Sequence, residues 1–383
     1  MEQQQKEQGT ERGGKSMWKS VAKATWKFTK KISPILIVAA VVNGPNVVRK
    51  THLDAKLNSW VNMVPLVENF KYVRDLFYRY ASSDLLEKKK LYEDFVIESA
   101  KKHLGGDEAL VWAVMMAESE MHERCVSPKG AIGLMQLMPY GARADWDLFD
   151  PKTNIEEGTR ELGGYIRKFK KLDLALSAYN AGPDRNSIKN GKIPQIIETQ
   201  YYVPRVLAYY DLFKNMLWPV STTREINSGY GMRIHPIWHV KRFHYGIDID
   251  ANYGDAIHAA LDGNVICANW IGGSGFRVDI EKVYEVPGSK AIRIVVSYSH
   301  LSNIMAQKGK YITRGKIIGR VGSTGESTGP HLDLKVTVGS IYMDSLFVLD
   351  GKQNLFIKTD GSIEKKDVAE VVVGAKIKRL DVQ

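Results

Sequence analysis

The sequence contains few cysteines, no long apolar run and no internal repeat, and each of these absences excludes a class of protein. Its two cysteines, Cys125 and Cys267, lie far apart and show no metal-ligand spacing, which excludes a disulfide framework. The apolar run ISPILIVAAVV at residues 32–42 is shorter than the ~20 residues that a membrane-spanning helix needs. No basic stretch is interleaved with base-stacking aromatic residues, so the sequence does not favour nucleic acid as a partner.

The composition is that of a folded, multidomain protein with an excess of positive charge. The 383 residues are enough for roughly two or three domains, and 44% hydrophobic with 25% charged residues is ordinary for globular chains. The formal net charge of +11 suits anionic surroundings, such as a membrane surface or the acidic polymers of a cell wall.

Residues 1–31 are polar and basic, with Lys or Arg at eight positions against three Glu. Lysines recur every four residues from Lys15 to Lys31, and Trp18, Val21 and Phe28 lie between them. This spacing predicts a basic amphipathic helix that lies against an anionic membrane. The alternative is a solvated helix or a disordered arm.

Residues 32–48 hold the apolar run and its interruption at Asn43, Gly44 and Pro45. Three interpretations compete, namely a short membrane anchor, an export signal and a buried helix. The basic flank that precedes the run favours an anchor or export signal with a cytoplasmic N-terminus. Residues 49–90 carry apolar residues at helical spacing, which predicts a helical stalk.

The rest of the chain changes character once. Helical patterns continue through residues 91–216, whereas Gly-rich turns and alternating apolar residues dominate residues 217–350. Residues 351–383 form a C-terminal tail with short strand-like pieces. The expected fold is therefore multidomain α + β, with a membrane-associated N-terminal helix, an all-α domain and a mostly antiparallel β domain.

Glu118 lies on the apolar stripe of the predicted helix EALVWAVMMAESEM, for which Asp107 is a suitable N-cap. A carboxylate on a buried face is costly unless it is paired or protonated, so its pKa is expected to rise. A pKa near neutrality is what a general acid needs. Taken alone, the pattern also fits a glutamate that reaches solvent from the end of a helix.

The segment AESEMHERCVSPKGAIGLMQLMP at 117–139 resembles the signature of the lytic transglycosylases, which is Glu-Ser followed by Ser-Pro-x-Gly-Ala-x-Gly-Leu-Met-Gln-Leu-Met-Pro. The resemblance continues in the family's order through LFDPKTNIEEG (148–158), ALSAYNAGP (175–183) and ETQYYVPRVL (198–207). It implies a goose-type-lysozyme-like fold, with the glycan strand of peptidoglycan as substrate.

By this resemblance, Glu118 protonates the glycosidic oxygen between N-acetylmuramic acid and N-acetylglucosamine and then acts as base on the sugar's own 6-hydroxyl. The product is a 1,6-anhydro sugar, and the internal attack explains why one carboxylate can suffice. The resemblance also places a set of residues in the substrate cleft: Ser119, Gln136, Tyr179, Asn180 and Tyr201, with Tyr202 as the alternative to Tyr201.

In the segment FHYGIDID, His244 and Asp248 share one face of a predicted strand. A straight strand would hold them about 13 Å apart, whereas zinc–ligand bonds are only ~2 Å long. Both residues can bind one ion only if the chain bends between them. Gly246 is the position where such a bend is least strained.

Residues 225–349 resemble the lysostaphin/LytM-type zinc endopeptidases through INSGYGMRIHP (226–236), HYGIDIDANYGDAIHAALDGNV (244–265), YSHLSN (298–303) and GSTGESTGPHLDLKV (322–336). The resemblance implies a Zn2+ cofactor with His244 and Asp248 as its first two ligands. It makes His300 and His331 catalytic residues that do not bind the metal but act on its water and on the oxyanion. The implied substrate is a stem or cross-bridge peptide of peptidoglycan.

The motif STGPHLDLKV departs from the last motif of this family, His-x-His, because Asp333 stands where the third zinc ligand is a histidine. His331 and Asp333 share a strand face, and aspartate can bind zinc through oxygen. The prediction is therefore a metal site of His244, Asp248 and Asp333, with a less positive zinc. The alternative is a domain that has lost its metal and serves as a binder or activator.

Together these features predict a membrane-associated enzyme of the cell envelope or periplasm that cuts both the glycan and the peptides of peptidoglycan. Three settings are candidates, namely a phage or virion entry machine with this chain as a virion component, a conjugation or secretion apparatus, and remodelling of the wall. The alternative function is a wall-binding structural or activator module whose peptidase-like domain is inactive.

Overall fold

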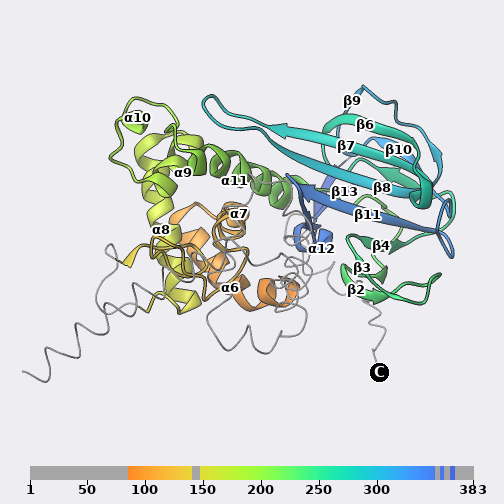
Figure 1. Cartoon of the computed structure of the whole chain (residues 1–383), viewed down its shortest axis with the longest axis horizontal. Coiled ribbons are helices and arrows are strands. Elements are labelled where there is room, and N and C mark those ends of the chain that lie inside the picture. The colour runs from red at the N-terminus through yellow and green to blue at the C-terminus, as the bar shows by residue number, and fades with distance from the viewer. Residues whose placement is uncertain (1–84, 140–146, 350–353, 358–362, 367–383) are drawn as a thin grey trace, which may run out of the picture. The chain divides into compact units, whose positions relative to one another are not determined.

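The computed structural model describes residues 85–139, 147–349, 354–357 and 363–366, which form a helical domain followed by a β domain (Figure 1). The predicted change from helices to strands is confirmed, because the helix that closes the first domain ends at Asn215 and the first strand begins at Ile226. The predicted segments 1–31 and 32–48, and residues 49–84 of the predicted stalk, lie outside the described residues. No helix in the described ranges has both the length and the hydropathy that a bilayer crossing requires.

The helical domain is built around one helix, α7 (Glu108–Ser119), whose middle part is apolar on all sides. Its helices, in the described residues, are α6 (Leu85–His103), α7 (Glu108–Ser119), α8 (Pro151–Phe169), α9 (Leu172–Ala181), α10 (Asn186–Lys189) and α11 (Ile197–Asn215). Every residue of α7 from Ala109 to Ala117 is buried, as expected for a helix that is apolar on all sides. Helix α11 packs along α7 and places its own side chains next to the C-terminal end of α7.

The prediction of Asp107 as N-cap is confirmed in position, because α7 begins at the next residue. The Asp107 side chain makes no capping hydrogen bond to the helix backbone. Its Oδ2 instead accepts hydrogen bonds from the Tyr210 hydroxyl and from Lys214 Nζ, both on α11. Asp107 therefore ties the start of α7 to α11, which fixes the relative position of these two helices.

The β domain consists mainly of one antiparallel sheet, and ten of the strands in the described residues belong to it. The strands are β1 (Ile226–Ser228), β2 (Gly231–Ile234), β3 (Lys241–His244), β4 (Ile247–Asp250), β5 (Ala256–His258), β6 (Gly263–Trp270), β7 (Phe276–Tyr284), β8 (Ile292–Ile304), β9 (Tyr311–Ile312), β10 (Ile317–Val321), β11 (His331–Val338), β12 (Ile341–Met343), β13 (Asn354–Ile357) and β14 (Ile363–Lys366). The order along the sheet is β1-β4-β11-β8-β7-β6-β9, with β10, β5 and β12 attached beside it. Strands β2 and β3 form a separate hairpin, and β13 pairs with β14.

The chain leaves the β2–β3 hairpin and enters the sheet at Tyr245 and Gly246, between β3 and β4. A Cβ atom on Gly246 would lie 2.5 Å from the Leu334 carbonyl oxygen and 2.7 Å from Asp333 Oδ1. Real Cβ atoms do not approach other heavy atoms so closely, so β11 requires glycine at this position. The bend that the sequence requires between His244 and Asp248 is confirmed, because His244 Nε2 lies 3.2 Å from Asp248 Oδ1.

Helix α12 (Ser345–Leu349) follows the sheet and joins the two domains (Figure 1). Its Phe347 is fully buried and packs edge-on against Trp112 of α7 and Phe213 of α11, with ring centroids 6.2 Å and 5.2 Å away. Lys89 of α6 donates a hydrogen bond of 2.8 Å to the Phe347 carbonyl oxygen. A side chain from the end of the β domain thus completes the core of the helical domain.

Candidate active sites

Glu118 lies at the C-terminal end of α7, where this helix is packed against α11. Its side chain is half-buried, and burial raises the pKa of Glu118 from 4.5 to about 7. The Tyr202 hydroxyl and the Arg205 guanidinium partly offset this effect by lowering the pKa, and the charge on Glu198 adds to it. The rise in pKa that the sequence predicts for Glu118 is therefore confirmed.

Two buried groups lie beside Glu118. The Tyr202 hydroxyl acts on the Glu118 carboxyl and lowers its pKa, whereas Arg205 Nε has no hydrogen-bond partner among the described residues. Arg205 Nη2 donates to the Ala117 carbonyl oxygen at 3.2 Å, which holds the guanidinium against the end of α7. Buried polar atoms without partners are uncommon in folded proteins, so Arg205 Nε is suited to meet a ligand next to Glu118.

The residue predicted from the sequence to contact the substrate is Tyr201, with Tyr202 as the alternative. Tyr201 is half-buried, and its hydroxyl makes no hydrogen bond within the part of the chain that the structure describes. Tyr202 is only 2% exposed, and its hydroxyl lowers the pKa of Glu118. Of the two tyrosines, Tyr202 is therefore the one that acts on the charge of Glu118. Substrate contact by Tyr201 stays a prediction.

Ser119 and Gln136 organise the loop that faces the end of α7. Ser119 is buried, and its hydroxyl donates a hydrogen bond of 2.8 Å to the Leu134 carbonyl oxygen. Gln136 Nε2 donates to the carbonyl oxygens of Gly133 and Cys125 at 2.8 Å and 3.0 Å. Both side chains thus hold the loop through its backbone, and contact with a substrate stays a prediction for each.

Tyr179 and Asn180 come from α9 and reach the same region. The Tyr179 hydroxyl donates to the Met135 carbonyl oxygen at 2.8 Å, and burial together with the charge of Glu118 raises the pKa of Tyr179 well above its ordinary value. Asn180 Oδ1 accepts a hydrogen bond of 2.7 Å from the Thr199 hydroxyl. Ser119, Gln136 and Tyr179 are therefore gathered around one loop, whereas Asn180 contacts Thr199 of α11.

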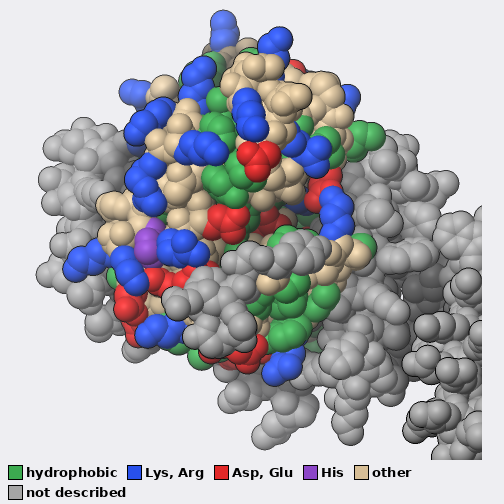
Figure 2. All heavy atoms as spheres, turned by 90° about the vertical axis from the view of Figure 1, so that its left-hand side faces the viewer, with side chains coloured by type: hydrophobic (Ala, Val, Ile, Leu, Met, Phe, Trp, Pro, Cys, Tyr) green, Lys and Arg blue, Asp and Glu red, His purple; other side chains and the backbone are tan. Residues whose placement is uncertain are grey.

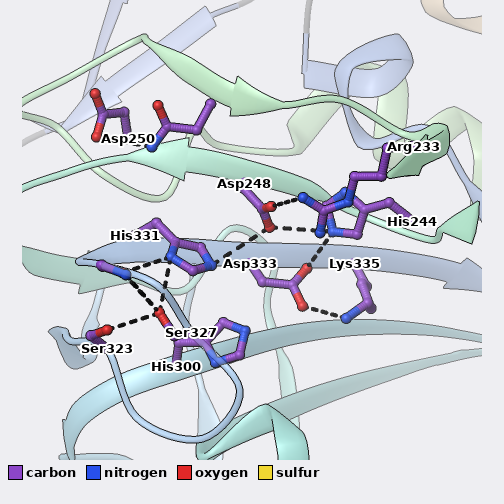
Figure 3. Close-up of polar contacts among 12 residues, drawn as sticks. Arg233, His244, Asp248, Asp250, His300, Ser323, Ser327, His331, Asp333 and Lys335 are labelled. Carbon is purple, nitrogen blue, oxygen red and sulfur yellow. Dashed lines mark hydrogen bonds and ion pairs between the residues drawn. The ribbon is translucent and has the colours of Figure 1, made fainter. Parts of the chain in front are cut away.

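The second site lies in the β domain, where His244, Asp248 and Asp333 converge (Figure 3). All three side chains are buried, and they come from β3, β4 and β11 respectively. Asp248 and Asp333 are direct cross-strand partners in the β4–β11 pair. His244 Nε2 lies 3.2 Å from Asp248 Oδ1 and 3.4 Å from Asp333 Oδ1.

These three residues fit a zinc ion in both spacing and chemistry. Two ligand atoms on a tetrahedral zinc with ~2 Å bonds lie about 3.3 Å apart. The distances of 3.2 Å and 3.4 Å from His244 Nε2 match that spacing, and the three ligand atoms all lie within 4.8 Å of one another. One imidazole and two carboxylates are all established zinc ligands.

The orientation of His244 also fits a metal ligand. Its Nδ1 lies 3.1 Å from the Gly229 carbonyl oxygen, which can only accept, so Nδ1 carries a proton. Nε2 then faces two carboxylate oxygens, an arrangement that calls for a cation at this point. A proton can supply it: burial opposes the charge, but Asp248 and Asp333 outweigh burial and raise the pKa of His244 to about 9.

Each carboxylate of this cluster gives one oxygen to the centre and the other to a basic side chain (Figure 3). Asp248 Oδ2 accepts a hydrogen bond of 2.9 Å from Arg233 Nη1, and Asp333 Oδ2 accepts one from Lys335 Nζ. Burial alone would raise the pKa of Asp333, but Lys335 and His244 hold it well below its usual range. Neither basic residue is among the site residues predicted from the sequence, although Lys335 follows Asp333 by two residues and so shares its strand face.

His300 and His331 lie beside the three candidate ligands, with ring centroids 4.8 Å apart (Figure 3). His300 Nδ1 donates to the Thr324 carbonyl oxygen at 2.7 Å, and His331 Nδ1 donates to the Gly329 carbonyl oxygen at 2.9 Å. Each ring therefore keeps Nε2 for other chemistry. Burial lowers the pKa of His300, which favours its neutral form.

The backbone of His300 is unusual in a way that is common at functional sites. Its φ is 66°, in the left-handed region that residues other than glycine rarely occupy. The register between β8 and its neighbour β7 shifts at the same place. Such strain persists only where the surrounding structure enforces it, and here it accompanies the turn of the His300 ring toward His331.

Comparisons with known families match each domain separately. A model of the transglycosylase SLT domain matches residues 95–198, and a model of peptidase family M23 matches residues 242–345. The chain carries an SLT domain followed by an M23 domain. Glu118 and Gln136 lie within the SLT match, whereas Tyr201 and Tyr202 follow its last residue. All three candidate metal ligands lie within the M23 match.

Several individual proteins are similar to part of this chain. DD-carboxypeptidase/endopeptidase Mpg of Neisseria meningitidis is 38% identical over 120 residues, which are 31% of this chain and 26% of that protein. Peptidoglycan DD-endopeptidase ShyA of Vibrio cholerae is 30% identical over 165 residues, 43% of this chain and 34% of that protein. The chain thus spans about a quarter to a third of the length of these curated relatives. The solved catalytic domain of lysostaphin from Staphylococcus simulans is 32% identical, with 32% of this chain and 90% of that chain covered and a TM-score of 0.28.

Proposed function

We propose that this protein degrades peptidoglycan with two activities, a lytic transglycosylase in the SLT domain and a zinc endopeptidase in the M23 domain. One observation carries the proposal: a single chain holds a carboxylic acid with a pKa near neutrality and, in another domain, a buried group of three convergent ligand atoms. Figure 2 looks onto the helical side of the molecule and shows many Lys and Arg side chains on this face. Such a face, like the net charge of +11, suits an anionic wall polymer.

In the SLT domain, Glu118 would act first as acid and then as base. At a pKa of about 7, a substantial fraction of Glu118 is protonated at neutral pH and can donate a proton to the glycosidic oxygen. The resulting carboxylate can then take the proton of the sugar's 6-hydroxyl as that oxygen closes the 1,6-anhydro ring. The Tyr202 hydroxyl, which lowers the pKa of Glu118, would stabilise its charged form during this exchange, and the unpartnered Arg205 Nε would hold the substrate.

In the M23 domain, His244, Asp248 and Asp333 would hold the zinc, which supplies a Lewis acid for the peptide carbonyl and for an attacking water. His300 and His331 each have Nδ1 committed to a backbone carbonyl, so Nε2 is the atom that can exchange a proton with water or with the leaving amine. His331 Nε2 lies 3.8 Å from Asp248 Oδ1, which places it at the edge of the ligand cluster. The substrate class is a stem or cross-bridge peptide, in keeping with the endopeptidase names of the M23 relatives.

Product analysis tests both activities in one experiment. The full-length protein is incubated with purified peptidoglycan, and the products are identified by mass spectrometry. Sugars that end in a 1,6-anhydro ring, together with new peptide amino termini, are the expected result. Glu118→Gln should abolish only the anhydro products, and Glu98→Gln on the exposed face of α6 is the matched control. Reducing sugar ends would show hydrolysis and would remove the transglycosylase assignment.

We propose further that the protein acts at the cell envelope or periplasm and opens the wall locally, for virion entry or for a secretion or conjugation machine. The basic pattern of residues 1–31 and the apolar run in residues 32–48 support attachment to a membrane. Two cutting activities on one attached chain would restrict damage to a small area of wall.

Membrane attachment is tested by comparing the full-length protein with a form that begins near residue 50. The full-length protein should sediment with membranes, and the shorter form should stay in the soluble fraction and keep its glycan cleavage. Full-length protein with an intact N-terminus that stays wholly soluble would contradict this part of the proposal.

A second candidate function is a wall-binding or activator module whose peptidase-like domain holds no metal. The observation that favours it is that Arg233 and Lys335 already balance the charges of Asp248 and Asp333. Metal analysis after exhaustive dialysis separates the two functions, because a binder module would retain no zinc.

A further inference from the structure

The two carboxylate oxygens of Asp333 have different neighbours. Oδ1 faces His244 Nε2 at 3.4 Å, on the side where the three ligand atoms converge. Oδ2 accepts a hydrogen bond from Lys335 Nζ, which also forms an ion pair with it (Figure 3). Asp333 is therefore arranged to offer one oxygen to a metal, while its other oxygen is held by a positive charge.

Lys335 is firmly placed for this contact. It lies two residues after Asp333 on β11, so both side chains project from the same face of the strand. Its side chain is 22% exposed, whereas that of Asp333 is only 5% exposed. A largely buried ion pair is screened little by salt, so the Lys335 charge acts on the centre at close range.

The Asp333–Lys335 ion pair changes the net charge around the three candidate zinc ligands. With neutral His244, the ligands Asp248 and Asp333 together carry two negative charges, and Arg233 pairs with the first of them. The Lys335 ammonium cancels the charge of Asp333, so the pair has the net charge of a neutral ligand. We propose that the Asp333–Lys335 pair acts as one neutral ligand unit, and that Lys335 lowers the zinc affinity of the centre and keeps the bound ion electrophilic. This inference rests on the proposed zinc centre.

An alternative role for Lys335 would be to orient Asp333 through its hydrogen bond, without an effect of its charge. The two roles predict opposite results when the charge is removed. Loss of an orienting partner weakens metal binding. Loss of a nearby positive charge strengthens it, because the ammonium and the metal ion repel each other.

The test measures the zinc affinity of full-length, metal-free protein by competition with a chromophoric chelator. Lys335→Gln keeps a hydrogen-bond donor and Lys335→Met does not, but both remove the charge. Both are expected to bind Zn2+ about tenfold more tightly than the wild type. Lys310→Gln, which removes an exposed charge next to β9 at the opposite end of the sheet order, is the matched control and should bind as the wild type does.

A second arm exchanges the ligand. Asp333→His supplies a neutral ligand, so Lys335 becomes an uncompensated charge, and this variant is expected to bind zinc more weakly than the wild type. Lys335→Gln in the same chain should restore the affinity. Thermal unfolding of each metal-free variant shows that it is folded.

Equal or weaker zinc binding by Lys335→Gln or Lys335→Met overturns the neutral-unit inference and leaves the zinc centre in place. Equal binding by Asp333→His with and without Lys335→Gln overturns it in the same way. Absence of zinc binding in the wild type and in every variant overturns the proposed endopeptidase as well.

Discussion

Glu118 and Asp333 are both shielded from solvent, yet their pKa values move in opposite directions because their neighbours differ. Burial dominates at Glu118, where Tyr202 and Arg205 compensate only in part, so the pKa rises to about 7. At Asp333 the cations Lys335 and His244 overcome burial and hold the pKa low. The first carboxyl can therefore exchange a proton near neutral pH, and the second stays charged as a ligand must.

The raised pKa of Glu118 predicts a pH-dependent effect on stability. The pKa of Glu118 is about 7 in the folded protein, against an ordinary value of 4.5. Between these two pH values the folded protein keeps a proton on Glu118 that the unfolded chain has released. This contribution is fully present below pH 4.5, falls as the pH rises and is lost above pH 7, a total of up to about 3 kcal/mol. Glu118→Gln cannot ionise and should melt at a higher temperature than the wild type at pH 8, with little difference at pH 4. A stability difference that does not change between these two pH values would contradict the raised pKa.

Asp333 is predicted to be a ligand, so Asp333→Ala should lower zinc affinity and peptide cleavage together. The loss should exceed about a hundredfold in affinity, because outer-shell changes alone can reach that size. Asp250→Ala is the matched control, since Asp250 lies on neighbouring β4 but bonds to Asn227 and stands apart from the cluster (Figure 3). Zinc content is measured after dialysis, and glycan cleavage should stay unchanged. Equal zinc content in wild type and Asp333→Ala would remove Asp333 from the ligand set.

Among the elements, the two-residue period of the β strands predicts which side chains share a face, whereas the pattern of helix α11 does not predict which of its side chains are buried. The two-residue period of a strand is enough to place His331 and Asp333 on one face, and Gly246 marks the bend that brings His244 to Asp248. Arg233 could not be found in this way, because it reaches Asp248 from the separate β2–β3 hairpin. Such a contact depends on how two distant segments pack.

Helix α11 shows why the helical site was only partly predictable. Buried residues are spread over its length and include Tyr202, Val206 and Tyr209, and even Pro204 lies inside it. Apolar and aromatic residues occur on most sides of such a helix, so the period cannot choose between Tyr201 and Tyr202. Packing against α7 buries Tyr202 and leaves Tyr201 half-buried, a difference that the period does not show.

The break between β3 and β4 predicts a clear effect of one added methyl group. Gly246→Ala places a Cβ against the Leu334 carbonyl oxygen and Asp333 Oδ1, so β11 and its ligand must shift. We expect zinc affinity to fall with a loss of stability of about 1–3 kcal/mol, as overpacking usually costs. Gly164→Ala, whose methyl would meet nothing in α8, is the matched control and should not destabilise the protein. Unchanged zinc affinity in Gly246→Ala would show that the centre tolerates a displaced strand.

For the whole molecule, the sequence indicates two domains in the right order, but it does not show how they are joined. The motifs of each domain are local in the chain, whereas Phe347 reaches Trp112 and Phe213 across a large separation in sequence. No period or motif marks Phe347 as part of the helical core. Only the fold brings it there.

This contact predicts that the two domains unfold together. Phe347→Ala should destabilise the protein by about 3–5 kcal/mol, as expected for the loss of a buried aromatic ring. In differential scanning calorimetry the wild type should give one heat-absorption peak, and the variant should give a lower and broader one as the domains begin to melt separately. Two well-resolved peaks in the wild type would contradict the coupling.

The position of Phe347 also bears on how freely such domains can be exchanged between proteins. A chain cut near residue 217 at the apparent boundary would leave the helical part with an open hydrophobic site and the β part with an exposed aromatic ring. Fusion of either half to a new partner would therefore need a substitute for this one ring. A helical domain that is transferred to another protein must therefore carry more of the chain than the segment that holds its motifs.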